Sequence, residues 1–386
     1  MQKTIYFDHN ATTPVNPIVF KAMEPFYKEE FGNASSLHGK GRPARHAVDN
    51  ARHILASFLG ASDEDILFTS GGTESDNIAI KGVCWANQDK GNHIITSLIE
   101  HSAVLSTCKF MEKNGYKVTY LPVDKFGMVS TEDLKKAITD KTVLISIMHA
   151  NNETGTIQPI KELAKIAKEK KILFHTDAVQ SFGKLDIDVD NIGVDLLSVS
   201  AHKIYGPKGV GALYLRKGVK IIPLSHGGHH ERNLRAGTEN VPGIVGFGKA
   251  VELASGDRKE KNRHLSALRD RLHNGLTKAI ADVYLNGHPT ERLPNTANLS
   301  FKYIEGESIM LNLDFKGICV STGSACTSGT LEPSYVLTAM GVEAANAQGS
   351  IRFSLGEENT VEEVEYCISV LPEIITRLRA MSPLKK

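Results

Sequence analysis

One lysine of this chain stands where a strand would leave a sheet. Lys203 follows the mostly apolar run 194–199 and precedes a loop that contains Gly206, Pro207 and Gly209, a pattern typical of a buried strand that ends in a turn. Desolvation in such a position lowers the pKa of an amine, and an uncharged amine can condense with a carbonyl to form a Schiff base. A solvated loop lysine is the simpler interpretation, so the chemistry depends on what surrounds Lys203.

A glycine-rich turn predicts a phosphate site. Gly71, Gly72 and Thr73 follow the apolar run 65–69 and open a helical pattern, so backbone amides and a hydroxyl would stand at the positive end of a helix dipole. A helix cap without any ligand is the alternative. Further donors would come from Ser200, His202 and Thr238. Because this set lacks the nucleotide-type Gly-x-x-x-x-Gly-Lys loop, we expect a phosphate-bearing cofactor other than ATP.

A carboxylate ends a second predicted strand. Asp177 follows the run 173–176, where its charge needs a partner because burial of an unpaired charge is costly. A protonated pyridine nitrogen would supply one, and that pairing would make a pyridoxal ring an electron sink. A helix N-cap is equally consistent with the spacing. Gln180 lies three residues further on, where its amide could reach the phenolic oxygen of such a ring.

Three more polar residues lie at or near predicted strands. His101 could stack on an aromatic cofactor or move protons, and a capping or core histidine is the simpler interpretation. Asn152 could contact cofactor and substrate, or only shape its turn. Arg352 alternates with apolar neighbours on a predicted strand. It therefore needs an anion, either a substrate carboxylate or an acidic side chain of the same chain.

One cysteine differs from the other four. Cys326 lies in the run 321–330 of small polar residues, which cannot pack a core, so we expect a mobile arm whose thiol is a nucleophile. An incidental surface cysteine is the alternative. Cys84, Cys108 and Cys367 lie in apolar helical patterns and are predicted to be inert. The wide spacing of the cysteines indicates neither a disulfide framework nor a zinc ribbon.

Composition argues against several classes of partner. The chain has 45 Lys plus Arg against 44 Asp plus Glu, so it has no overall field to attract nucleic acid or a membrane. No uncharged run approaches the roughly 20 residues of a membrane helix, and the first residues lack a signal core. We therefore expect a cytoplasmic protein. His226, His229, His230 and Glu231 lie in a segment rich in glycine and arginine, which predicts a loop, and we expect no intrinsic metal site there.

The elements that position these residues follow from hydrophobic periodicity. From about residue 65 to 216, short apolar runs alternate with amphipathic segments, which predicts crossover units and a mainly parallel sheet with ligands at its carboxyl edge. From residue 296 onward we predict a second, smaller unit. A chain of 386 residues exceeds the usual size of one domain. We place a large domain at 15–255 and a small domain, with the cysteine loop, at 1–14 and 256–386.

Taken together, the motifs resemble those of the NifS/IscS-type cysteine desulfurases, pyridoxal-phosphate enzymes of the class-V aminotransferase family. The resemblance implies an α/β fold of the aspartate-aminotransferase-like type (fold type I), with a large, mainly parallel-sheet domain and a smaller α+β domain. It spans nearly the whole chain and is carried by residues 8–14, 71–77, 151–155, 175–180, 200–203, 235–238, 324–328 and 350–354.

The resemblance also implies roles for the residues singled out above. Lys203 would carry pyridoxal 5'-phosphate, His101 would stack on its ring, and Asp177 would face the ring nitrogen. Asn152 and Gln180 would serve the other edge of the ring. Arg352, with Asn152, would bind the substrate L-cysteine. The phosphate would be held by Gly72, Thr73, Ser200 and His202, and by Thr238 of the neighbouring subunit of a homodimer.

The resemblance further implies that Cys326 takes sulfur from L-cysteine as a persulfide, releases L-alanine, and passes the sulfur to acceptors such as an iron-sulfur scaffold protein. Cys326 would at most be a transient iron-sulfur ligand during cluster transfer. The acceptor stays open among iron-sulfur assembly, nitrogenase clusters and tRNA thiolation. An aminotransferase or β-lyase on the same fold, or a catalytically silent assembly partner, are the alternatives. Cys326 disfavours the first two, because neither reaction needs a protein thiol.

Overall fold

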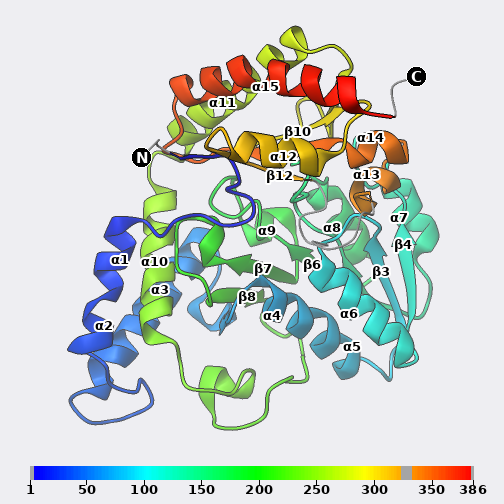
Figure 1. The fold of residues 1–386 in the computed structure, drawn as a ribbon. Coiled ribbons are helices and arrows are strands. Elements are labelled where there is room, and N and C mark those ends of the chain that lie inside the picture. Colours follow the sequence, from blue (N-terminus) through cyan, green and yellow to red (C-terminus); the bar gives the residue numbers. More distant parts are fainter. Residues whose placement is uncertain (1–3, 323–332, 384–386) are drawn as a thin grey trace.

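The structure, a computed structural model, describes residues 4–322 and 333–383 (Figure 1). Its largest sheet has seven strands in the order β2-β8-β7-β6-β5-β3-β4. Strand β8 is antiparallel to β2 and β7, and all the other neighbours are parallel. The strands are β2 (Ile66–Thr69), β3 (His93–Ser97), β4 (Lys117–Leu121), β5 (Thr142–Ser146), β6 (Leu173–Asp177), β7 (Leu196–Ser200) and β8 (Gly211–Leu215). The predicted mainly parallel sheet is therefore confirmed.

The central strands are apolar throughout because both of their faces are covered. Successive side chains of a strand point to opposite faces. Ile95, Ile145 and Leu197 accordingly belong to one apolar core, whereas their neighbours Ile94 and Leu144 belong to a second core on the other face. Strands buried on both sides have continuous apolar runs instead of an alternating pattern.

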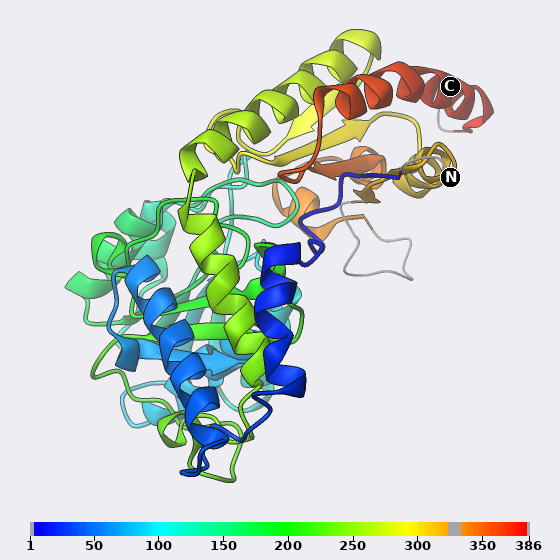
Figure 2. The same cartoon turned by 90° about the vertical axis from the view of Figure 1, so that its left-hand side faces the viewer.

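Helices cover both faces of the large sheet. The first core is covered by α1 (Pro17–Met23), α3 (Gly41–Leu59), α7 (Thr131–Ala137), α8 (Ile160–Glu169), α9 (Val189–Ile192) and α10 (Val241–Ser255). The second core is covered by α5 (Val83–Ala86), α6 (Ser102–Lys113) and the π-helical turn Ile78–Gly82 that joins α4 (Gly72–Asn77) to α5. Figure 2 shows α1 and α3 beside α10, with short α2 (Pro25–Lys28) below them.

A smaller unit with its own core lies beside this assembly (Figures 1 and 2). Its antiparallel sheet has the order β12-β13-β10-β9. The strands are β9 (Val283–Asn286), β10 (Thr296–Phe301), β12 (Ser321–Thr322) and β13 (Ser350–Ser354), and β1 (Ile5–Tyr6) pairs in parallel with β11 (Ile318–Cys319). The helices are α11 (Arg258–Ala279), α12 (Gly306–Asp314), α13 (Tyr335–Ala339), α14 (Ala344–Gln348) and α15 (Val361–Met381).

The distribution of the cores supports the proposed division of the chain. Helix α10 packs in a core of the large sheet, whereas α11 and β1 pack with the small sheet. The boundary drawn near residue 255 lies between α10 and α11, and it stays a prediction. The sequence analysis did not anticipate α12, nor β9, an edge strand whose apolar run is only three residues long. Among the described residues, no helix is long and apolar enough to cross a membrane.

Candidate active site

A cavity of about 330 Å³ lies where the carboxyl ends of β2, β6 and β7 meet the small unit. Parallel strands bring the residues that follow them to one edge of the sheet, so positions far apart in the sequence converge there. The predicted site residues that line the cavity are Gly72, Thr73, His101, Asn152, Asp177, Gln180, Ser200, His202, Lys203 and Arg352. Thr238 does not line it and is exposed, and Cys326 lies outside the described residues.

Lys203 lies in the short turn after β7, and its side chain enters the cavity half-buried. Its Nζ donates to the backbone carbonyl oxygens of Asn10, at 2.5 Å, and of Ala11, at 2.8 Å. The N-terminal segment therefore forms one wall of the cavity. The alternative of an ordinary solvated lysine does not describe this position, because the amine is held against backbone acceptors.

Asp177 ends β6 and is buried at the cavity wall. Its Oδ1 accepts a hydrogen bond from the backbone N–H of Val179 at 2.9 Å, so the predicted capping contact exists, although the following residues form a turn and no helix. Burial is the largest influence on Asp177 and raises its pKa above the usual range, while His101, the Val179 N–H and Lys203 offset this only in part. The carboxyl group is thus available to pair with a cation in the cavity.

His101 is the N-cap of α6, and its Nδ1 accepts the backbone N–H of Ala103 at 3.2 Å. The capping hydrogen bond, which was the simpler interpretation of His101, is therefore present. Burial lowers the pKa of His101, which favours the neutral ring. Because Nδ1 accepts, the proton of the neutral ring lies on Nε2. The residue can cap the helix and still present a donor toward the cavity.

Several cavity residues have polar atoms that the protein leaves unsatisfied. Asn152 Oδ1, Gln180 Oε1 and Arg352 Nε are buried and have no hydrogen-bond partner in the described parts of the chain. Buried polar groups are almost always paired. Three such atoms at one cavity fit a polar ligand that would complete their bonding.

Arg352 already has an acidic partner. Its Nη2 lies 2.7 Å from Asp8 Oδ1, and its Nη1 donates to the carbonyl of Asn152 at 3.0 Å. The intramolecular ion pair that the sequence analysis left open is therefore present. A substrate carboxylate would have to use the remaining Nε–H or displace Asp8 from the guanidinium.

The predicted phosphate donors surround the start of α4. Gly72 opens this helix so close to the turn after β6 that a Cβ atom on it would lie 2.6 Å from Cγ2 of Val179. Ser200 is buried at the end of β7. His202 contacts Thr12 Oγ1 through Nδ1 at 3.2 Å, and burial lowers its pKa to about 4. It is therefore a neutral hydrogen-bonding group at physiological pH.

Two cavity residues were missed by the sequence analysis. Asp76 lies on α4 and is buried, and its Oδ1 has no hydrogen-bond partner in the described residues. A signal was available, because Asp76 falls one helical turn after Gly72 and on the same face. Asn10 donates from Nδ2 to the carbonyl of Asn152 at 3.1 Å and to Thr296 Oγ1 at 2.9 Å. No local pattern marks Asn10, because its partners are distant in sequence.

Other reactive residues are engaged elsewhere. Glu231 of the histidine-rich segment pairs with Arg52, 2.6 Å away, and accepts the N–H of Phe68. Cys108 and Cys367 are buried, and burial raises the pKa of each thiol to about 12, as expected for inert cysteines. Cys84 is also buried, and its pKa is raised for the same reason.

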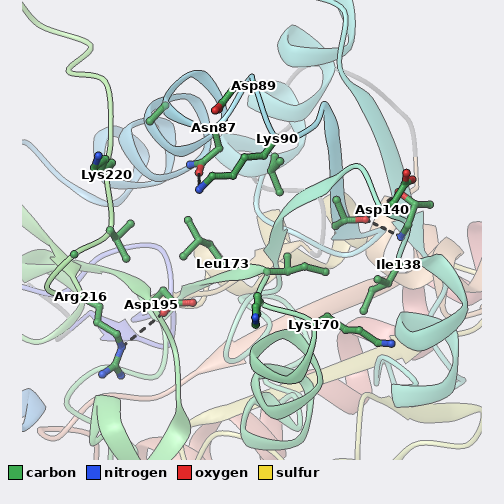
Figure 3. A pocket seen from close by; sticks show the side chains of 18 of the residues that line it. Asn87, Asp89, Lys90, Ile138, Asp140, Lys170, Leu173, Asp195, Arg216 and Lys220 are labelled. Carbon is green, nitrogen blue, oxygen red and sulfur yellow. Dashed lines mark hydrogen bonds and ion pairs between the residues drawn. The ribbon is translucent and has the colours of Figure 1, made fainter.

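A larger hollow of about 990 Å³ lies at the opposite edge of the sheet (Figure 3). It is lined by residues that precede β3, β5 and β7, including Lys90, Asp140 and Asp195, and by Leu173, the first residue of β6. Arg216 and Asp195 lie side by side at one edge of the hollow, 3.7 Å apart. None of the predicted site residues lines this hollow, so its position at the amino ends of the parallel strands separates it from the candidate active site.

Comparison with known proteins agrees with this geometry. The family model for class-V aminotransferases matches residues 5–367. A cysteine desulfurase IscS of Methanosarcina thermophila is 60% identical over 99% of this chain and 94% of that protein. A cysteine desulfurase IscS of Dictyoglomus turgidum is 58% identical over 100% of this chain and 98% of that protein.

Solved structures also resemble this chain over more than nine-tenths of its length. A NifS-like protein has a TM-score of 0.92 with 44% identity, covering 97% of this chain and all of that chain. A structure described as SspA in complex with cysteine has a TM-score of 0.81 with 40% identity over 92% of this chain and all of that chain. The fold is that of the fold type I enzymes. The chain belongs to the class-V aminotransferase family, in its NifS/IscS-type cysteine desulfurase branch.

Proposed function

We propose that this protein is a cysteine desulfurase that uses pyridoxal 5'-phosphate. Sulfur of L-cysteine passes to the thiol of Cys326, forming a persulfide, and the three-carbon product takes up a proton to become L-alanine. The observation that carries this proposal is the meeting of Lys203, Asp177 and His101 at one cavity with unsatisfied polar atoms. The full-length similarity to proteins named cysteine desulfurase supports the substrate.

The donor set of the cavity fits pyridoxal 5'-phosphate. When bound, the cofactor supplies an electron-accepting ring and a carbonyl carbon for an amine. Lys203 would hold that carbon, Asp177 would pair with the ring nitrogen, and His101 would lie against the ring. The unsatisfied amide oxygens of Asn152 and Gln180 support polar contacts to it. The phosphate would be bound by Gly72, Thr73, Ser200 and His202, with Thr238 from the partner subunit.

Different residues of the chain would then have different roles toward the substrate. Lys203 is the amine placed to take and return the α proton. Arg352 would bind the substrate carboxylate, and its existing bond to Asp8 makes this a competition between two carboxylates. Burial raises the pKa of Asp177, and His101, the Val179 N–H and Lys203 offset this only in part. A cationic ring opposite Asp177 would favour its ionised form.

The anchors of the cysteine segment support a role for Cys326 at this cavity. The segment leaves from β12, where Ser321 pairs with Arg352 in register. It returns at Ser334, whose Oγ donates to Glu153 Oε2 at 2.5 Å. Cys326 is four positions after Thr322 in the sequence, which allows a span of at most about 14 Å. Both ends of the segment lie beside the cavity wall, because Arg352 lines the cavity and Glu153 directly follows Asn152, which also lines it.

We also propose that the enzyme is a cytoplasmic homodimer that hands sulfur to an iron-sulfur scaffold protein. Large apolar side chains are exposed on α1, α2 and the segment after them: Ile18, Phe20, Tyr27, Phe31 and Leu37. An apolar group of this size is typical of a covered surface. A second copy that covered it would explain why Thr238 is exposed in the isolated chain.

The proposal is tested by incubating the purified protein with L-cysteine and measuring alanine together with a persulfide on Cys326 by mass spectrometry. The variant Cys326→Ala should keep the cofactor and lose sulfide release in the presence of a thiol, whereas Cys319→Ala, a half-buried cysteine of the small unit, should keep both. Sustained sulfide release by Cys326→Ala would exclude the persulfide role. Pyruvate in place of alanine would identify a β-lyase.

A further inference from the structure

A second carboxylic acid lies behind the one expected to pair with the cofactor. We propose that Asp76 is a positioning residue that shares one proton with Asp177 in the free protein and retains that proton, as a neutral acid, when Asp177 pairs with the cationic ring of the cofactor. This inference rests on the proposed function only for the identity of the ring. The proton sharing itself belongs to the protein without cofactor.

The geometry brings the two acids together. Asp76 lies on α4, one turn after Gly72, and both carboxyl groups line the cavity. A carboxylate oxygen of each, together with a ring nitrogen of His101, all lie within 4.8 Å of one another. Only 1% of the surface of Asp76 is accessible to solvent. Two buried carboxyl groups at this separation cannot both ionise without a cation between them.

The surroundings of the two acids are unequal. Asp177 accepts the backbone N–H of Val179 and faces His101 and Lys203, which stabilise its negative charge. A ring nitrogen of His101 lies within 4.8 Å of an Asp76 oxygen as well, but burial lowers the pKa of His101 and favours its neutral form. The carboxyl group of Asp76 has a hydrogen-bonding partner, Ser198. The Oδ1 atom of Asp76 has no hydrogen-bond partner in the described residues.

The groups that face Asp76 from neighbouring elements do not compensate its charge. His175 Nε2 of β6 lies 3.6 Å from Asp76 Oδ1. That ring is held between Ser146 Oγ at 2.8 Å and Ser198 Oγ at 2.9 Å, and burial lowers its pKa to about 3, so it stays neutral. Glu100, before α6, is a third buried carboxyl group, and burial raises its own pKa to about 8, so it offers no cation to balance a charge on Asp76. The shared proton therefore belongs on Asp76.

The pKa directions agree with this geometry. Burial raises the pKa of Asp76 well above its usual range, and the charge of Asp177 raises it further, whereas the bond from Ser198 lowers it. The pKa of Asp177 is raised by burial and lowered by three groups around it. A neutral Asp76 leaves the site with one negative charge, which matches one ring cation. Ionisation of Asp76 at high pH would add a second negative charge to the site.

Infrared spectroscopy of the wild-type protein tests the proton directly. We would label all aspartates with ¹³C at the carboxyl carbon, which separates their protonated C=O band from those of buried glutamic acids. At pH 7 the cofactor-free wild type should show a protonated aspartic acid band. It should be lost in Asp76→Asn and kept in Asp190→Asn, a change at an exposed aspartate. Loss of the band in Asp177→Asn with retention in Asp76→Asn would overturn the assignment, and so would absence of the band in wild type.

Cofactor affinity supplies a second measurement. Equilibrium dialysis with pyridoxal 5'-phosphate should give Asp76→Asn an affinity within about threefold of wild type at pH 7, because a neutral amide replaces a neutral acid. A loss of tenfold or more at this pH would show that Asp76 acts as an anion. If no cofactor binds to wild type, the proposed function fails, while the infrared result on the free protein still decides the proton sharing.

Discussion

At the scale of single residues, the amine of Lys203 is defined by what it contacts. It donates to the backbone carbonyl oxygens of Asn10 and Ala11, and both Asp177 and His101 interact with it electrostatically. These contacts distinguish Lys203 from the many lysines that only solubilise the surface. The chemistry expected of it needs a carbonyl partner, which the proposed cofactor provides.

We predict that Lys203→Ala loses both the covalent attachment of the cofactor and the transfer of the α proton. Desulfurase activity should fall by at least about 10³-fold, the usual scale for loss of a general base, and the visible absorbance of the protein-cofactor Schiff base should vanish. Lys208→Ala is the matched control, because Lys208 is exposed on the same loop. Equal losses in both variants would contradict the assignment.

At the scale of elements, the start of α4 and the turn after β6 must approach closely to form the cavity. Gly72 and Val179 come from these two elements, and both line the cavity. A Cβ atom on residue 72 would lie 2.6 Å from the Val179 side chain, a distance that forces one element to move. Glycine at this position is therefore a packing requirement of the site.

We predict that Gly72→Ala separates these two elements. Overpacking of this kind costs typically about 1–3 kcal/mol of stability, and the phosphate donors would move with the helix, so the affinity for pyridoxal 5'-phosphate should fall at least about tenfold, or about 1.4 kcal/mol. Urea unfolding and equilibrium dialysis measure the two effects. Gly256→Ala is the control, because a Cβ there meets its nearest atom at an ordinary 3.6 Å. Unchanged cofactor affinity in Gly72→Ala would refute the packing argument.

At the scale of the whole molecule, polar contacts join the two units around the cavity. The side chain of Asn10, in the N-terminal segment, bonds to Asn152 beside the large sheet and to Thr296 of the small sheet. Glu153 contributes to the same junction. It accepts a hydrogen bond from Ser334, and its backbone carbonyl accepts one from Asn298 Nδ2 at 3.2 Å.

We predict that Glu153 makes the stability of the molecule depend on pH. Burial raises its pKa from 4.5 to about 7. A raised pKa means that the folded state holds the proton more tightly, so this contribution is complete below about pH 4.5 and is lost as pH rises through about 7. Between these values the unfolding free energy of wild type should decrease by up to about 3 kcal/mol more than that of Glu153→Gln. Denaturant titrations at several pH values measure the difference, and parallel pH profiles would contradict it.

Much of the architecture was predictable because the information is local. Each apolar run between residues 65 and 216 became a strand, since burial on both faces requires continuous apolar side chains. Residues that follow such runs converge, because parallel strands end at one edge of the sheet. Lys203 and Asp177 could therefore be assigned to a common edge from their positions alone. The edge strand β9 was missed because its apolar run, Val283–Leu285, is only three residues long.

The order of residues along the chain was thus enough to predict the large sheet, the family and the set of reactive side chains at the carboxyl edge of that sheet. The tertiary structure decided their partners. Arg352 meets Asp8 across 344 positions of the chain, and Asp76 faces Asp177 inside one cavity. Such pairs carry no local signal, because periodicity reports whether a residue is buried, while only the packing of the two units determines which charge it will face.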